Sequence, residues 1–294
     1  MISVNSFTFT PPSSTLECCL VDSLNRLIRR NAFSWKSMQQ NLLQQKLIMK
    51  PSMGQTALTR FTFNVRDIDG LFPGFRSGDF AVLYGPQSVT SLVSKLCARA
   101  QLPAHLGGLE SNVVFIDCAN SSSLSDIGHA AKLEQLDAEA ALERVHNIRV
   151  YTAYRLTSLI MERLQEAVET RDAKLIVISD IAGPFLRENV DDQEAKTFYS
   201  QIMNYLANFA KKHHLIIIAT YLSHESSRRN SVLQEITTAK ANTVLRFTKT
   251  PYTKEVELEK HPTYMLGVAD LTSENQALTD FMGTASDGKD YFLM

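Results

Sequence analysis

Residues 85–92 read Gly-Pro-Gln-Ser-Val-Thr-Ser-Leu and occupy the place of a phosphate-binding loop, between an apolar run and a stretch with helical spacing. Such a loop needs a glycine, four free positions, a second glycine, a lysine that reaches the β- and γ-phosphates, and a hydroxyl residue that binds Mg²⁺. Gly85 supplies the first position, whereas the last three positions hold Thr90, Ser91 and Leu92. Threonine crowds the turn, serine carries no charge, and leucine offers no oxygen to a hard cation. The sequence therefore predicts the frame of a nucleotide site without its chemistry.

The elements around this loop are those that position a phosphate site. Residues 79–84 form a short apolar run typical of a buried strand, and helical spacing of apolar residues follows from Val89. Three more apolar runs are rich in β-branched residues: residues 113–116, 175–178 and 215–218. Helical stripes lie between the runs: Leu133, Leu136 and Ala140; Leu156, Leu159, Ile160 and Leu164; and Phe198, Ile202, Leu206 and Phe209. Alternation of this kind builds a parallel sheet, and alternating polarity in three segments after Asn242 predicts an antiparallel extension.

Across roughly residues 61–270 the chain resembles the RecA/RadA family of strand-exchange recombinases, in the branch shared by archaea and eukaryotes. Four stretches carry the match: residues 64–78, 101–117, 174–180 and 214–220. The second stretch is the most specific, because it is not a generic nucleotide-binding pattern. The resemblance implies an α/β fold with a RecA-like P-loop ATPase core at residues 53–271. We expect short N-terminal helices and a linker at residues 1–52 and a C-terminal tail at residues 272–294.

Carried over residue by residue, the resemblance removes the chemistry of an ATPase. The glutamate that polarises the attacking water in active members falls on Ala119. The aspartate of the metal site falls on Ser179, with Asp180 one step late and turned by strand alternation to the opposite face, unless a local bulge brings it back. The γ-phosphate sensor, normally an amide, falls on Tyr221. Because lysine, metal ligand, base and sensor are altered together, we expect no ATP hydrolysis.

These substitutions predict a catalytically inactive recombinase paralogue, a pseudo-ATPase without a cofactor that acts as an accessory and interaction protein in homologous-recombination repair. Residual ATP binding stays open, since a helix N-terminus with Ser88, Thr90 and Ser91 can donate hydrogen bonds to an anion. The alternative is an atypical nucleotide-dependent ATPase or switch of the wider RecA/KaiC group, with Asp180 as metal ligand. A RecA-like module in an unrelated complex is a third possibility, because fold does not fix function. Lys95, one helical turn beyond the usual lysine position, is predicted to lie at the surface.

In the family, two loops after the fourth and fifth core strands hold single-stranded DNA. The first corresponds to residues 181–193, where Arg187 faces a local excess of carboxylates that repel phosphate. The second corresponds to residues 222–241 and carries four basic residues that suit a phosphate backbone: His224, Arg228, Arg229 and Lys240. The alternative for this segment is an ordinary surface loop with a pair of arginines.

Assembly is the second property that the sequence alters. Family filaments form when a phenylalanine, and an alanine three residues later, insert from the linker into the neighbouring subunit. The matching residues 54–57 read Gly-Gln-Thr-Ala, and the chain contains no Phe-x-x-Ala. Buried aromatic anchors dominate interface energies, so we expect no homofilament. The expected partner is a RecA-family recombinase or another paralogue. Trp35 and the stripe through Leu42 are a candidate contact, and the alternative is that the N-terminal stripe packs on the core of this chain.

The composition of the chain excludes several classes of function. The 294 residues include 30 basic and 31 acidic side chains, a balance that argues against a strongly basic, self-sufficient nucleic-acid binder. The four cysteines, at positions 18, 19, 97 and 118, match neither metal-ligand spacing nor a disulfide framework. His213-His214 lacks a nearby second pair of ligands, so no metal is expected. No apolar run is long enough to span a membrane, and we expect an intracellular protein, cytoplasmic in a prokaryote and nuclear in a eukaryote.

Overall fold

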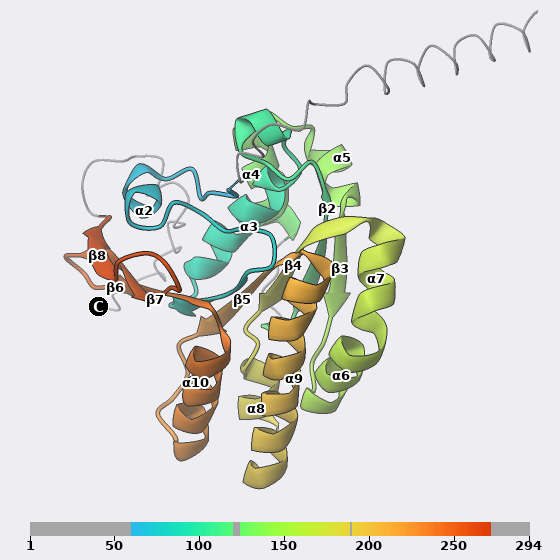
Figure 1. Ribbon diagram of the computed structural model, residues 1–294, viewed down its shortest axis with the longest axis vertical. Coiled ribbons are helices and arrows are strands. Elements are labelled where there is room, and N and C mark those ends of the chain that lie inside the picture. The colour runs from blue at the N-terminus through green and yellow to red at the C-terminus, as the bar shows by residue number, and fades with distance from the viewer. Residues whose placement is uncertain (1–59, 120–123, 189, 272–294) are drawn as a thin grey trace, which may run out of the picture. The chain divides into compact units, whose positions relative to one another are not determined.

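The computed structural model describes residues 60–119, 124–188 and 190–271 (Figure 1). The predicted N-terminal helical segment at residues 1–52 lies outside the described residues, together with Trp35 and Leu42. The linker residues 54–57 and the predicted tail at residues 272–294 also lie outside them.

Within the described residues, one sheet of eight strands carries the fold, in the order β3-β2-β4-β5-β1-β6-β7-β8. The strands are β1 (Phe80–Gly85), β2 (Asn112–Asp117), β3 (Val145–Arg149), β4 (Ala173–Ser179), β5 (Ile216–Leu222), β6 (Thr243–Lys249), β7 (Lys254–Lys260) and β8 (Gly267–Asp270). The pairs from β3 across to β6 are parallel, whereas β6 with β7 and β7 with β8 are antiparallel. The predicted α/β core with a mostly parallel sheet and an antiparallel C-terminal extension is confirmed.

Helices cover both faces of the parallel part of the sheet. They are α2 (Arg66–Leu71), α3 (Val89–Arg99), η1 (Ala104–Leu106), α4 (Leu124–Leu133), α5 (Ala138–Glu143), α6 (Ala153–Ser158), the π-helical turn η2 (Leu159–Arg163), α7 (Leu164–Arg171), α8 (Gly183–Arg187), α9 (Asp192–His213) and α10 (Arg228–Lys240). Alternate residues of a strand face different helix layers. On β1, Leu83 packs in the core that contains α3, whereas Val82 packs in the core that contains α9. In Figure 1, α9 and α10 lie side by side in this second layer.

Two elements differ from what apolar spacing predicts. The expected helix through Leu133 and Ala140 is two helices, because the chain turns at Gln135, which has a φ of 61°. Asp137 then caps α5 by accepting a hydrogen bond of 2.8 Å from the Ala140 amide. Strand β3 was not predicted at all. It is an edge strand in which only Val145 is fully buried, so it lacks the continuous apolar run of a central strand.

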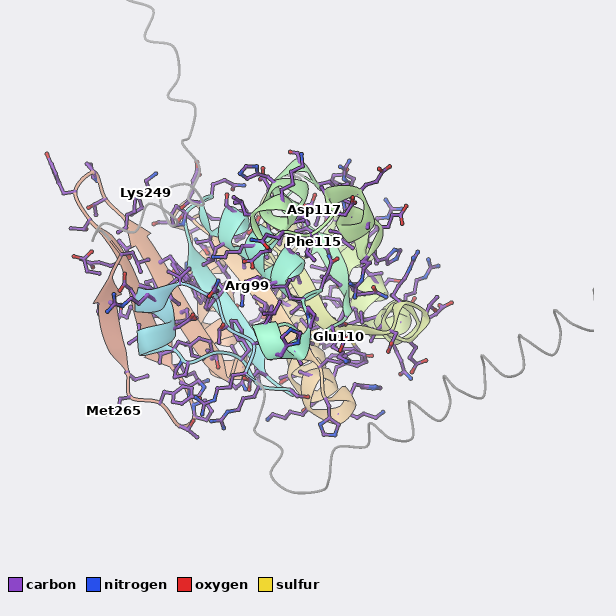
Figure 2. The ribbon with its side chains drawn as sticks, turned by 90° about the horizontal axis from the view of Figure 1, so that it is seen from above. Arg99, Glu110, Phe115, Asp117, Lys249 and Met265 are labelled. Atoms are coloured by element: carbon purple, nitrogen blue, oxygen red, sulfur yellow. The ribbon has the colours of Figure 1, made fainter. Side chains whose placement is uncertain are left out.

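The antiparallel strands extend the sheet on the side away from β3. In Figure 2, Lys249 at the end of β6 and Met265 before β8 lie at opposite ends of this extension. The outer strand β8 has one solvent-exposed face, as the alternating pattern predicts, and Val268 on this strand is 59% exposed. Within the described residues, no helix is both long and apolar enough to cross a bilayer.

The register of the parallel strands brings four strand ends to one edge. Gly85 of β1 pairs with Leu222 of β5, and Asp117 of β2 pairs with Ser179 of β4. The loops that follow these strands therefore share the carboxyl edge of the sheet, where open α/β sheets bind their ligands.

Candidate nucleotide and nucleic-acid sites

The loop after β1 curls directly into the first turn of α3. The Val89 amide donates to the Pro86 carbonyl at 3.0 Å, and the Thr90 amide donates to the Gln87 carbonyl at 3.0 Å. The Thr90 hydroxyl donates to the same Gln87 carbonyl at 2.6 Å. Two amides and one hydroxyl that would face an anion in a phosphate-binding loop thus serve the turn itself.

Packing also fixes the residues at both ends of this loop. A Cβ atom on Gly85 would lie 2.5 Å from the Cγ2 atom of Val89 and 3.0 Å from the Phe247 carbonyl oxygen, so only glycine fits there. Leu92 is 6% exposed and belongs to the core beneath α3. Ser91 is partly exposed and uncharged. Neither the phosphate charge nor Mg²⁺ finds its usual partner at these positions.

Lys95 does not substitute for the missing lysine, and its predicted surface position is wrong. The side chain is buried, with 5% of the residue exposed, and its Nζ donates to the Asn64 carbonyl at 3.3 Å. Burial lowers the pKa of this amine below its ordinary value. The amine is therefore directed toward the segment before β1 rather than toward the loop.

Asp180 lies one residue beyond the end of β4, in the left-handed region with a φ of 53°. Its carboxylate is 1% exposed and accepts from two side chains. Nη1 of Arg187, on α8, lies 3.1 Å from Oδ2, and Nε2 of His224, after β5, lies 2.7 Å from Oδ1. Both partners belong to the α8–α10 side of the sheet, as strand alternation predicts for a residue next to Ser179. The carboxylate is therefore occupied by the chain itself.

Ala119 and Tyr221, at the positions predicted for the catalytic glutamate and the γ-phosphate sensor, supply neither a carboxylate nor an amide. Ala119, after β2, carries no carboxylate. The ring of Tyr221 stacks on Tyr84 with centroids 4.9 Å apart, and its hydroxyl donates to Oδ1 of Asn230 at 2.6 Å. Burial raises the pKa of the Tyr221 hydroxyl, so it stays a neutral donor. The guanidinium of Arg246 lies 4.8 Å from the centroid of the Tyr84 ring. This stack could not be predicted from the sequence, because Tyr84, Tyr221 and Arg246 are far apart along the chain.

These residues do not fit a Mg²⁺-nucleotide. The loop closes on itself, the metal-hydroxyl position is in the core, and Asp180 already accepts from Arg187 and His224. One polar atom in the loop favours residual binding of an anion. The Ser88 hydroxyl oxygen is buried and has no hydrogen-bond partner among the described residues. In the same part of the chain, no three His, Cys, Asp or Glu side chains converge in a metal-binding group.

The segment predicted to be the second DNA loop, residues 222–241, is mostly helix. Residues 223–227 form the connection, and α10 begins at Arg228, with the Ser227 hydroxyl accepting from the Asn230 amide at 3.1 Å. Lys240 is at the far end of α10, about 18 Å along the axis from Arg228 at the α-helical rise. His224 is bound to Asp180. The four basic residues therefore do not form one surface.

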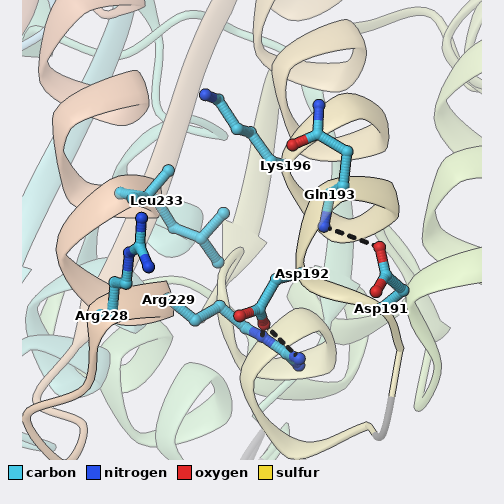
Figure 3. A pocket seen from close by; sticks show the side chains of 8 residues that line it. Asp191, Asp192, Gln193, Lys196, Arg228, Arg229 and Leu233 are labelled. Carbon is cyan, nitrogen blue, oxygen red and sulfur yellow. Dashed lines mark hydrogen bonds and ion pairs between the residues drawn. The ribbon is translucent and has the colours of Figure 1, made fainter.

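Arg229 holds the neighbouring loop together instead of facing solvent. Its guanidinium donates to the carboxylate of Asp192 and to three carbonyl groups, those of Phe185, Glu188 and Val190, at 2.6–3.2 Å. A phosphate contact would require these bonds to break, so the predicted role of Arg229 in DNA binding is not supported by its geometry. Arg228 is exposed and makes no ion pair or hydrogen bond within the described residues. Figure 3 shows both arginines beside a hollow of about 300 Å³ between the first turns of α9 and α10.

The acidic loop before α9 behaves as a capping segment. Asp191 accepts from the amides of Gln193 and Glu194 at 2.9 and 3.3 Å, as expected for a helix N-terminus. Arg187 of this loop is bound to Asp180 and to the Cys118 carbonyl. That this loop does not attract phosphate stays a prediction.

A second surface lies along the lateral edge of the sheet that β3 forms. Strand β3 pairs with β2 and with no other described strand, so one row of its backbone groups is unpaired. A groove of about 550 Å³ follows this edge, lined by β3, η2 and α7: His146, Asn147, Ile148, Arg149, Leu159, Arg163, Glu166, Ala167, Thr170 and Arg171. Within the described residues, the guanidinium groups of Arg149, Arg163 and Arg171 make no ion pair or hydrogen bond. Asn147 Oδ1 is buried there and also lacks a partner among the described residues.

The mostly parallel sheet with helices on both faces and an antiparallel C-terminal extension defines a RecA-like α/β core. The Rad51 family model matches residues 55–242, and the chain belongs to the Rad51 family. The predicted resemblance to RecA/RadA recombinases is thereby confirmed.

Similar curated proteins are named for recombination and DNA repair. The chain is 30% identical over 128 residues to the DNA repair protein RAD51 homolog 1 of Arabidopsis thaliana, which covers 42% of this chain and 37% of the relative. It is 31% identical over 96 residues to the meiotic recombination protein DMC1 of Saccharomyces cerevisiae, covering 33% and 28%. It is 23% identical over 150 residues to the DNA repair and recombination protein RadA of Aeropyrum pernix, covering 50% and 46%. The chain thus spans less than half the length of each of these relatives.

Proposed function

We propose that this chain is a Rad51-family paralogue that supports homologous-recombination repair as an interaction protein and does not hydrolyse ATP. Leu92 supports this function most directly: it stands where a metal-binding hydroxyl is needed, and it is part of the core. Ser91 and Ala119 remove the lysine and the glutamate as well. Phosphoryl transfer depends on charge stabilisation and an oriented water, and no single one of these groups replaces the others.

The test is ATP turnover and Mg²⁺-ATP binding by the purified chain. We expect hydrolysis at background level and no binding heat at micromolar nucleotide. Ser91→Lys alone is the matched variant, and it should stay inactive because the metal ligand and the base are still missing. Turnover that disappears in Asp180→Asn would contradict the proposal and favour the atypical ATPase. Binding without turnover would identify the Ser88 region as a residual nucleotide site.

The groove along β3 supports the interaction role. An extended segment of another protein can add to the free strand edge through main-chain hydrogen bonds, while the groove selects its side chains. Arg149, Arg163 and Arg171 surround this edge, against one acidic lining residue, Glu166. Burial and the nearby Arg171 lower the pKa of His146, so the imidazole stays neutral there. This charge pattern favours an acidic, extended segment of a recombination partner.

A further inference from the structure

Asp180 carries a buried carboxylate whose partners are side chains of this chain itself. A buried, ionised carboxylate is strongly unfavourable unless charged or polar groups compensate it. In an ATPase with an aspartate at this edge, a bound metal supplies much of that compensation. Here the compensation comes from Arg187 and His224, which donate to different oxygens of the same carboxylate.

The same cluster joins the ends of three strands. Asp180 follows β4, and its amide donates to the Thr220 hydroxyl on β5 at 2.8 Å. Arg187 also donates to the carbonyl of Cys118, directly after β2. His224 lies in the connection between β5 and α10, so its bond to Asp180 fixes that connection.

The local backbone is shaped for this cluster. A Cβ atom on Gly183 would lie 2.0 Å from Oδ2 of Asp180 and 2.7 Å from Nη1 of Arg187. Only glycine lets α8 approach the carboxylate closely enough for Arg187 to reach it. Asp180 itself is in the left-handed region, with a φ of 53°, and its carboxylate contacts Arg187 of α8.

We infer that Asp180, Arg187 and His224 form an internal latch that compensates the buried carboxylate at the carboxyl edge and keeps the β5–α10 connection ordered without any ligand. The latch neutralises the buried carboxylate through Arg187 and satisfies its other oxygen through His224. It makes the conformation of this edge independent of nucleotide and of divalent cations. This independence does not rest on the proposed function, because a chain that still bound nucleotide elsewhere could keep the same latch.

Thermal unfolding of the full chain tests the latch. We expect Arg187→Met/His224→Gln to lower the melting temperature by about 10 °C, because a buried carboxylate loses both donors. Adding Asp180→Asn to that pair should restore at least half of the loss, since the uncompensated charge is gone. Arg163→Met, which removes an arginine from the β3 groove, is the matched control and should leave the melting temperature unchanged.

Several outcomes separate the latch from an ordinary surface contact. If the double variant does not fold but the triple variant does, the latch is supported. A double variant as stable as the wild type, or a triple variant no more stable than the double, would overturn it. Amide exchange gives a second readout at Asp180 and Ile181, whose amides donate to Thr220. Exchange there should quicken in His224→Gln and stay unchanged when excess Mg²⁺-ATP is added to the wild type, and slowing by Mg²⁺-ATP would also overturn the latch.

Discussion

Lys95 illustrates how a single residue can be assigned to the wrong environment from its spacing. It is one helical turn beyond the degenerate lysine position, yet its stem packs under α3 and its amine reaches Asn64. Helical spacing alone cannot show this, because a long side chain buries its stem wherever neighbouring side chains leave room. The predictions at Ser91, Leu92 and Ala119 require only the residue type at a fixed position, which the sequence displays directly.

The buried amine of Lys95 leads to a prediction about pH. Desolvation lowers its pKa in the folded chain below the ordinary value of 10.5. In the window between the two values the unfolded chain holds more protons, so stability rises with pH there. We expect the free energy of unfolding to rise more steeply toward pH 10.5 in the wild type than in Lys95→Met. Urea denaturation at several alkaline pH values measures this, and parallel curves for the two proteins would show that the amine titrates normally.

The neighbouring arginines at the start of α10 should behave differently. Arg229→Ala should destabilise the fold by about 3 kcal/mol, because it leaves three carbonyl groups and Asp192 without their donor. Arg228→Ala should leave stability unchanged and reduce the salt slope of single-stranded DNA binding by about 0.7, the value for one lost phosphate contact. Denaturant melts and DNA titrations at several salt concentrations check both. A stable Arg229→Ala protein that loses DNA binding would restore the phosphate role predicted from the sequence.

Among the helices and strands, the buried strands could be predicted from the sequence. Elements whose buried side chains are polar, or which are only partly buried, could not. Strands β1, β2, β4 and β5 are continuous apolar runs, which only a buried strand explains at that length. Helix α10 was expected to be a loop because its buried side chains include Asn230 and Thr237. These bond to Tyr221 and Tyr199, so the helix packs through hydrogen bonds that a hydrophobic pattern does not reveal.

We expect the edge strand β3 to bind an acidic, extended peptide. The probe is a fluorescent peptide of alternating glutamate and valine, which can pair as a strand and present carboxylates to the groove. We expect it to bind, and we expect Arg163→Glu/Arg171→Glu to weaken binding at least tenfold, because two attractive contacts become repulsive. Arg155→Glu, an exposed position on α6 outside the groove, is the matched charge control.

Two further peptides separate strand addition from charge alone. A peptide with lysine in place of glutamate should not bind. Methylation of the alternate backbone amides that would donate hydrogen bonds to β3 should abolish binding of the glutamate peptide. Binding that survives methylation, or that is equally lost in Arg155→Glu, would mean that the groove attracts anions without acting as a strand-addition site.

Across the whole molecule, the described residues keep the fold expected of the Rad51 family, whose model matches residues 55–242. The fold was predictable because apolar runs and family stretches are local in sequence. The latch was not, because Asp180, Arg187 and His224 come from different elements and meet only when β4 and β5 are side by side. A cluster of this kind has no spacing that a single sequence displays.

Assembly is the last property that follows from the whole chain. The sequence contains no Phe-x-x-Ala, the pattern that the family resemblance links to filament assembly. Its balance of 30 basic and 31 acidic residues predicts little general attraction to DNA. We expect the purified chain to sediment as a small species at physiological salt, with or without long single-stranded DNA. Adding a Rad51-family recombinase should shift it into a heteromeric complex, and that shift should be lost in Arg163→Glu/Arg171→Glu if the β3 groove is the contact. Large self-assembled species on DNA in the absence of a partner would contradict this expectation, and would mean that the chain polymerises through a contact other than the phenylalanine anchor.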